Sequence, residues 1–272
     1  INSVAGASTR DIWLHSALSG SANLSVGMVN NALVLFGTNT AYSGNWTVNS
    51  GRIEIGNNAQ DPLGSGSVLL SGLANSLTFN ATNDFTINNA IDGFGAIVKL
   101  NTNTVTLGGN NPLAGTVVVS NGVLRLSNAG AIANVSYITL AGGTIDAAPI
   151  GGLALNEGLG QILNCRGTVN GNLSAGSANT LNFNLTALTN DVLNINGTLT
   201  LNGNPMLNLA LSGFKPSGTY RLINYTGTIQ GGGSFTLIPP PESSATFQLD
   251  TSTPGQVNLI ITAASQNLTW VG

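Results

Sequence analysis

The chain has 272 residues, only 6% of them charged, with a formal net charge of −3 at pH 7 and an isoelectric point near 4.8. Globular domains average about 25% charged residues, and binding to nucleic acid requires a basic patch, so nucleic acid is excluded as a partner. Apolar residues make up 42% and recur at strand spacing, which excludes disorder, and no apolar run is long enough for a membrane helix, which excludes membrane insertion of this segment.

The first predicted element is an opening coil, or the end of a preceding unit, over residues 1–20, where only 11–15 has a strand pattern. The chain begins at Ile1 without a methionine or a signal peptide, so we expect it to be a processed or excised piece of a longer protein. From residue 21, short apolar strands alternate with glycine and asparagine turns. These predicted strands are 32–36, 46–48, 52–55, 67–70, 76–79, 84–87, 96–100, 104–107, 116–119, 123–126, 137–140 and 143–146.

The later part of the chain keeps the strands but changes their composition. Strict alternation over 192–201 places Leu and Ile on one side and Asn and Thr on the other. Only 148–163 could be read as a helix, and its glycines argue against that reading. A composition shift near 203–216 marks a variant C-terminal section, 203–272, in which 239–241 is a rigid proline loop. Its predicted strands are 206–211, 219–225, 234–238, 245–249 and 257–261.

The stretch 107–128 repeats the stretch 36–57 at a spacing of 71 positions, so that Gly51 matches Gly122 and Ile53 matches Leu124. Each copy consists of a turn, a short strand, a glycine corner and a second strand. Such a unit cannot bury its apolar face alone, so a neighbouring coil must cover it, as in a solenoid. We predict about a dozen coils of roughly 20–25 residues. Leu124 and Leu126 would belong to an internal apolar ladder, and Asn and Thr would cover the outside.

The motifs 42–44 (Tyr-Ser-Gly) and 51–55 (Gly-Arg-Ile-Glu-Ile), with Gly-Gly-Asn-Asn-Pro-Leu-Ala-Gly at 108–115, resemble the β-strand repeat of bacterial autotransporter passengers. The resemblance implies an all-β fold, a single right-handed parallel β-helix displayed outside the cell. It assigns 21–202 to the β-helix repeats. Within 203–272, the segment 218–227 resembles strands that close a passenger module, and 267–272 resembles the opening strand of another module.

No constellation of residues indicates catalysis, so we expect no enzyme and no catalytic, cofactor-binding or metal-binding residues. Glycoside hydrolysis needs two carboxyl groups about 5–10 Å apart, but the acids are scattered, and only Asp84 and Asp92 are close in sequence. His15 is the single histidine and is expected at the surface, whereas Cys165 is expected to fill the core. Neither a zinc cluster nor a calcium-binding glycine repeat is present in the sequence. Stacking on sugars is conceivable at Tyr42, Trp46 and Tyr220.

Two functions are consistent with this sequence. The first is an extracellular structural module of a bacterial surface fibre or surface layer, a β-solenoid spacer that stacks end to end. The alternative is an adhesin passenger that binds a host, cell or polysaccharide surface. The low charge favours the first, because a free soluble rod normally carries abundant charge. No capping device is evident in the sequence, so we predict head-to-tail stacking on a copy or on further coils. Its interface candidates are Leu268, Trp270 and Val271.

Overall fold

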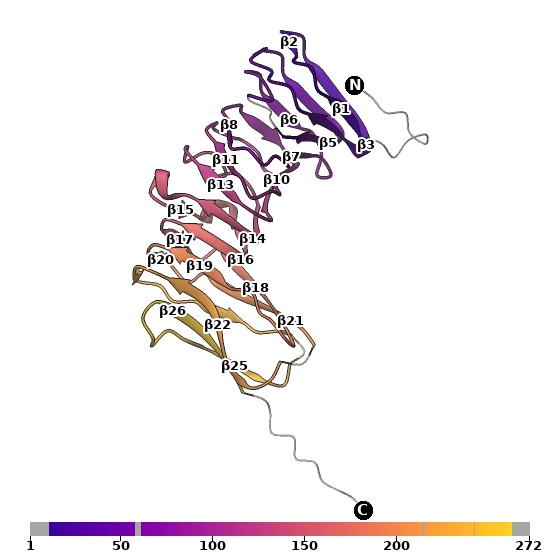
Figure 1. Cartoon of the computed structure of the whole chain (residues 1–272). Helices are drawn as coiled ribbons and strands as arrows, with labels where there is room; N and C mark the ends of the chain where they lie inside the picture. Colours follow the sequence, from indigo (N-terminus) through magenta and orange to yellow (C-terminus); the bar gives the residue numbers. More distant parts are fainter. Residues whose placement is uncertain (1–10, 58–60, 214, 242, 263–272) are drawn as a thin grey trace, which may run out of the picture.

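The computed structural model describes residues 11–57, 61–213, 215–241 and 243–262. It is an all-β parallel solenoid of about nine turns, so the predicted fold class is confirmed. Figure 1 shows the coils stacked along one axis, from the indigo N-terminal end to the yellow C-terminal end. No helix among the described residues is long and apolar enough to span a bilayer.

The surface that organises the molecule is one continuous parallel face, here called the long face. It contributes most of a 20-stranded sheet, and each of its strands pairs with the strand one coil away. Its strands are β1 (Ile12–Leu14), β3 (Leu24–Leu35), β5 (Trp46–Ile55), β7 (Ser76–Phe79), β10 (Ala96–Lys99), β12 (Thr116–Val119), β14 (Tyr137–Asp146), β16 (Ile162–Asn170), β18 (Thr180–Thr186), β21 (Met206–Ser212) and β24 (Thr236–Ile238).

Two further faces complete each coil. The second face consists of β8 (Phe85–Ile87), β11 (Thr104–Leu107), β13 (Val123–Leu126), the ends of β14 and β16, β19 (Leu193–Asn196) and β22 (Gly218–Tyr225). The third face consists of the beginnings of β3 and β5 with β6 (Val68–Leu70) and β9 (Ile91–Gly93), and then a separate sheet of β15 (Leu153–Ala154), β17 (Leu173–Ala175), β20 (Leu199–Leu201) and β23 (Ile229–Gln230).

The remaining elements are short. A two-stranded sheet joins β2 (Ser19–Gly20) to β4 (Ala41–Tyr42). In the segment that could have been read as a helix, the structure has only two single-turn 3₁₀ helices, η1 (Ala148–Ile150) and η2 (Glu157–Leu159). A left-handed glycine ends each of them, Gly151 after η1 and Gly160 after η2, so neither can extend into an α-helix.

The core is one apolar column that runs the length of the solenoid. Leu124 pairs in register with Val105 below and Ile145 above, and both Leu124 and Leu126 are buried, as predicted. The coils lengthen toward the C-terminus, however. Ile97 pairs with Val117 across 20 residues, whereas hydrogen bonds between the last coils span 30 residues. About nine turns therefore form rather than about a dozen.

The 71-residue repeat proves to be a repeated corner and not a repeated coil. Gly51 and Gly122 both have positive φ, and a Cβ on either would lie about 2 Å from a carbonyl oxygen of the coil below, so both corners require glycine. Ile53, however, lies on the long face, opposite Leu77, whereas Leu124 lies on the second face, opposite Val105. The same strand–corner–strand unit is thus used at different corners of the coil.

The prediction that asparagine covers the outside is wrong at several corners. The buried Asn111 accepts a hydrogen bond from the Ile91 amide at 2.9 Å and donates one to the Ala131 carbonyl at 2.9 Å. Its amide thereby joins three successive coils through backbone groups that would otherwise be buried without partners. Other buried asparagines that bond to backbone groups are Asn39, Asn75, Asn89 and Asn179.

The prediction that no capping device is present is also wrong. β25 (Thr246–Asp250) and β26 (Gln256–Thr262) form an antiparallel hairpin, and β26 pairs antiparallel with β22. This hairpin covers the open edge of the second face at the C-terminal end. The other two faces end in parallel strands, β24 and β23, which within the described residues pair only with the coil below.

Candidate binding surface on the first four coils

The outward positions of β1, β3, β5 and β7 bring together polar and aromatic residues that are far apart in sequence. Register on the long face aligns Trp13 with Val34, Glu54 and Thr78 in one row along the axis. A parallel row holds Arg52 beside Ser76, at the start of the same strands. Because neighbouring strands lie about 4.8 Å apart, each row is a ladder of side chains at that spacing.

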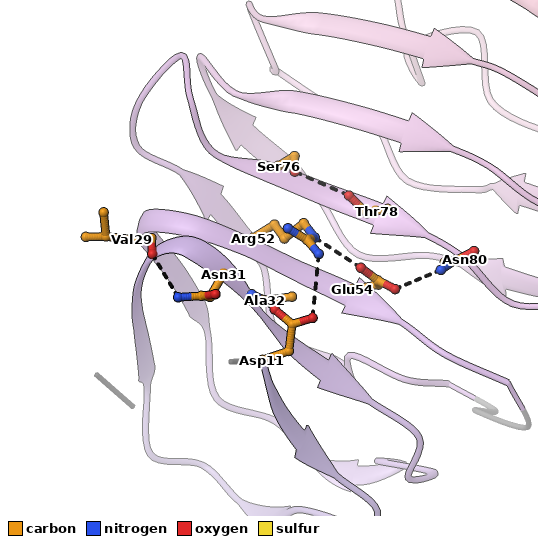
Figure 2. A network of polar contacts seen from close by, with 9 residues as sticks. All are labelled: Asp11, Val29, Asn31, Ala32, Arg52, Glu54, Ser76, Thr78 and Asn80. Carbon is orange, nitrogen blue, oxygen red and sulfur yellow. Dashed lines mark hydrogen bonds and ion pairs between the residues drawn. The ribbon is translucent and has the colours of Figure 1, made fainter. Parts of the chain in front are cut away.

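A polar network crosses these rows, and Figure 2 shows it from close by. Arg52 donates from Nε to Glu54 Oε2 at 3.0 Å, and its Nη2 lies 3.8 Å from Asp11 Oδ2. Asn80 donates to the other Glu54 oxygen at 2.8 Å, and the Ala32 amide donates to Asp11 Oδ1 at 2.7 Å. The network therefore ties four successive coils together and holds the guanidinium between two carboxylates.

An aromatic cluster, defined as Trp13, His15 and Phe36, lies at the other end of the same strands. The His15 and Phe36 rings stack with centroids 4.5 Å apart, and the Trp13 ring lies 5.6 Å from the Phe36 ring in a tilted arrangement. Phe36 leans over Gly56, where a Cβ would come within 2.5 Å of its ring. The Trp13 side chain is 64% exposed, so a large apolar ring faces solvent.

A groove of about 490 Å³, the corner groove, opens where the chain enters the long face. Arg52 forms part of its wall, and Leu73, 83% exposed, stands at its side. Its lining comes from three successive coils, with asparagine, serine and glycine predominating: Val29, Asn30, Asn31, Asn49, Ser50, Gly51, Arg52, Gly72, Leu73, Ala74, Asn75 and Ser76.

The chemistry of this surface favours binding over catalysis. Both oxygens of Glu54 accept hydrogen bonds, and Asp11 is engaged by a backbone amide and by Arg52. A general base or acid must have an oxygen directed at the substrate, and these carboxylates direct theirs at protein groups. Within the described residues, no three His, Cys, Asp or Glu side chains are grouped as metal ligands.

Two of the three proposed sugar-stacking aromatics are misplaced. Tyr42 and Trp46 are buried and pack edge to face with centroids 5.3 Å apart, and Trp46 Nε1 donates to the Leu63 carbonyl at 2.9 Å. Tyr220 is half-buried, with the Lys215 ammonium 4.4 Å from its ring centroid. In the aromatic cluster the Trp13 and His15 side chains are exposed and Phe36 is half-buried, so His15 lies at the surface as predicted.

The acids close in sequence do not meet. Asp84 precedes the second face and accepts from the Thr104 amide at 2.7 Å, whereas Asp92 points outward from β9 on the third face and accepts from the Gly93 amide. Asp84 shares a groove of about 530 Å³ with Asp61 and Arg125 instead. Arg125 is paired there with Asp146, at 2.8 Å.

Two buried side chains with reactive groups, Cys165 and Lys99, belong to the interior of the solenoid and not to the surface site. Cys165 is enclosed in the core as predicted, and burial raises the pKa of its thiol well above the usual value, while Arg166 turns outward to the Ala141 carbonyl. Lys99 occupies an inward position of the long face between Phe79 and Val119. Its ammonium reaches the corner carbonyls of Asn101 and Asn121, and burial lowers its pKa to about 8, opposed by the charge of Asp84.

The predicted interface candidates Leu268, Trp270 and Val271 lie outside the described residues, so the head-to-tail prediction is not tested at these positions. Sequence reasoning missed the aromatic cluster because Phe36 is 21 positions from His15. That distance is one coil, as the pairing of Ile12 with Leu33 shows. The coil period was therefore the signal that could have predicted the cluster.

No family model matches this chain. A comparison with curated proteins finds the adhesin BmaC autotransporter of Brucella suis biovar 1 (strain 1330), 26% identical over 229 residues and 77% of this chain. The chain is a weak homologue of an autotransporter adhesin. Its parallel β-solenoid is consistent with the β-helix of an autotransporter passenger, as the sequence resemblance implied. The chain spans 6% of the length of that adhesin.

Proposed function

We propose that this chain is a non-catalytic spacer segment of an extracellular or cell-surface autotransporter passenger. The observation that carries the proposal is the long face, which continues from β1 to β24 with one strand per coil and an apolar column behind it. Such a stack is quasi-one-dimensional, since each coil contacts chiefly its neighbours. Coils can therefore be added without changing those already present, which suits a spacer.

The N-terminal end of the stack supports continuation into further coils. Within the described residues, β1 pairs only with β3, so its other edge presents backbone donors and acceptors. Ile12 is an inward residue of the ladder and yet remains 37% exposed at this end. A preceding β-helix coil, or the end of a second copy, would pair with that edge and cover Ile12. At the other end, β24 offers a similar edge on the long face.

A second candidate function is adhesion, the role named for the weakly similar Brucella protein. It is supported by the exposed Trp13 ring, the corner groove and the network between them. The two functions are compatible, since a spacer coil can carry a binding surface on its outer side.

Sedimentation velocity of the purified chain over a range of concentrations tests the spacer proposal. We expect concentration-dependent end-to-end oligomers, which Ile12→Asp and Trp270→Asp both weaken by placing a charge at an end. Leu188→Asp is the matched control, because Leu188 is 93% exposed. A chain that stays monomeric throughout, or that responds equally to Leu188→Asp, contradicts end-to-end stacking.

A further inference from the structure

We propose that the outer surface of the first four coils binds a neutral oligosaccharide, with the aromatic cluster as its apolar platform and the corner groove as its polar cradle. This inference deepens the adhesive candidate and does not depend on the spacer role. It identifies the ligand class from the side chains that the coil register brings together, which come from β1, β3, β5 and β7.

The apolar part of the site is the Trp13 ring. A sugar ring presents one face of C–H groups, which packs against an aromatic ring while its hydroxyls point to the side. Trp13 is 64% exposed, and Phe36 supports it from the next coil at 5.6 Å between centroids. His15 stacks on Phe36 with the ring centroids 4.5 Å apart and limits the movement of that ring. The platform is therefore held in place before a ligand arrives.

The polar part of the site is suited to hydroxyl groups. The corner groove is lined by amide and hydroxyl side chains, including Asn30, Asn49 and Ser50, from successive coils. An amide offers both donors and an acceptor, so it can bond to a hydroxyl in either sense. The exposed Leu73 provides an apolar side wall to this groove.

Charge selects a neutral ligand. Among the described residues of this surface the single cation is Arg52, which lies between Asp11 and Glu54, so these three side chains carry one more negative than positive charge. A sulfated, phosphorylated or nucleic-acid polymer would face net repulsion. The Arg52 side chain is 35% exposed and has donors beyond those used by the two carboxylates, so it can still donate to a sugar hydroxyl.

The dimensions fit a short chain of sugars. From the corner at Ser50 to Ile55 at the end of β5 the surface extends about 17 Å at 3.3 Å per residue. Figure 2 shows Arg52, which also lines the corner groove, bonded to Glu54, and the register places Glu54 in the same row as Trp13. One oligosaccharide could therefore stack on Trp13 at one end and contact Arg52 where it enters the groove at the other.

The test is calorimetric titration of the purified chain with cellohexaose, laminarihexaose, xylohexaose and chitohexaose, with heparin as the anionic comparison. We expect at least one neutral hexasaccharide to bind and heparin not to bind. Trp13→Ala should weaken binding about tenfold or more, and Arg52→Gln should weaken it by a smaller factor. Tyr137→Ala is the aromatic control, since Tyr137 is 45% exposed on the same face three coils beyond Ser76. Arg125→Gln is the control for a paired arginine.

The outcomes separate this inference from the proposed function. Absence of binding by all four hexasaccharides, or equal losses in Trp13→Ala and Tyr137→Ala, overturns the saccharide site and leaves the spacer untouched. If the chain instead adheres to cell surfaces in a way that protease treatment of those surfaces abolishes and periodate does not, the ligand is a protein and the inference is wrong. Circular dichroism of each variant verifies that the solenoid is intact.

Discussion

The buried lysine on the long face provides the sharpest energetic prediction. Lys99 is fully enclosed, with Phe79 one coil below and Val119 one coil above. Among the described residues, its ammonium bonds only to the corner carbonyls of Asn101 and Asn121, and no carboxylate there forms an ion pair with it. The charged form is therefore costly in the folded state, and we predict that Lys99→Met stabilises the protein near neutral pH.

The magnitude and its sign follow from the pKa. Burial lowers the pKa of Lys99 from 10.5 to about 8. Each pKa unit corresponds to 1.36 kcal/mol, so the charged form costs the folded state up to about 3 kcal/mol. The unfolded chain binds the extra proton between pH 8 and 10.5, so the contribution of Lys99 to stability rises with pH across that window. Below pH 8 the full cost is present, and above 10.5 it disappears.

The assay is urea unfolding followed by circular dichroism at several pH values from 7 to 10.5, with the wild type compared with Lys99→Met. We expect the variant to be about 1–3 kcal/mol more stable at pH 7, because two corner carbonyls lose a donor and offset part of the gain. The difference should shrink as the pH rises. Lys99→Arg stays charged, so its free energy of unfolding should not exceed that of the wild type at any of these pH values. A difference that is constant from pH 7 to 10.5 would refute the reasoning.

Other positions give independent tests. Leu126→Asp should lower the free energy of unfolding by several kcal/mol in urea titrations, since it buries an unpaired carboxylate, and an unchanged midpoint would show that the ladder is misassigned. Gly51→Ala should be more destabilising than Gly151→Ala by about 1–3 kcal/mol. Both glycines have positive φ, but only Gly51 has a carbonyl oxygen 1.9 Å from the new Cβ. Equal losses of stability would show that the positive φ alone, and not the contact with the coil below, accounts for the effect. Cys165 should react with a thiol reagent only after unfolding, and fast native reaction contradicts its burial. Trypsin should not cleave at Arg125 under native conditions, because its strand is paired on both sides. Rapid cleavage there would contradict a stacked core.

The sequence predicted the strands best where aliphatic residues alternate between glycine corners. β7, β11, β12 and β13 have the predicted bounds, and the ladder of Leu124 and Leu126 follows from their alternation. No strand was predicted over 162–186, where β16, β17 and β18 lie. Asparagine is unfavourable in an isolated strand. Here Asn182 donates to Asn164 at 2.9 Å, and Asn208 donates to Asn182 at 3.0 Å. Hydrogen bonds between stacked amides therefore offset the low β-strand propensity of asparagine.

The candidate site was much less predictable than the fold. Single-residue patterns identify an inward or outward position, but a surface cluster depends on which residues lie one coil apart. Coil lengths vary from 20 residues between Ile97 and Val117 to 30 between Leu193 and Ile223, so a fixed period does not align distant residues. Alternation with Ile97 places Lys99 inward, opposite Phe79, where a charged side chain is not expected.

The most direct test of the central claim is electron microscopy of the purified chain. The account predicts straight or gently curved rods that join end to end, with strands continuing across each junction and with fewer junctions in Ile12→Asp. Uniform rods of one length that never join, or rods that associate only side by side, would contradict the proposal that these coils form a spacer within a longer β-solenoid.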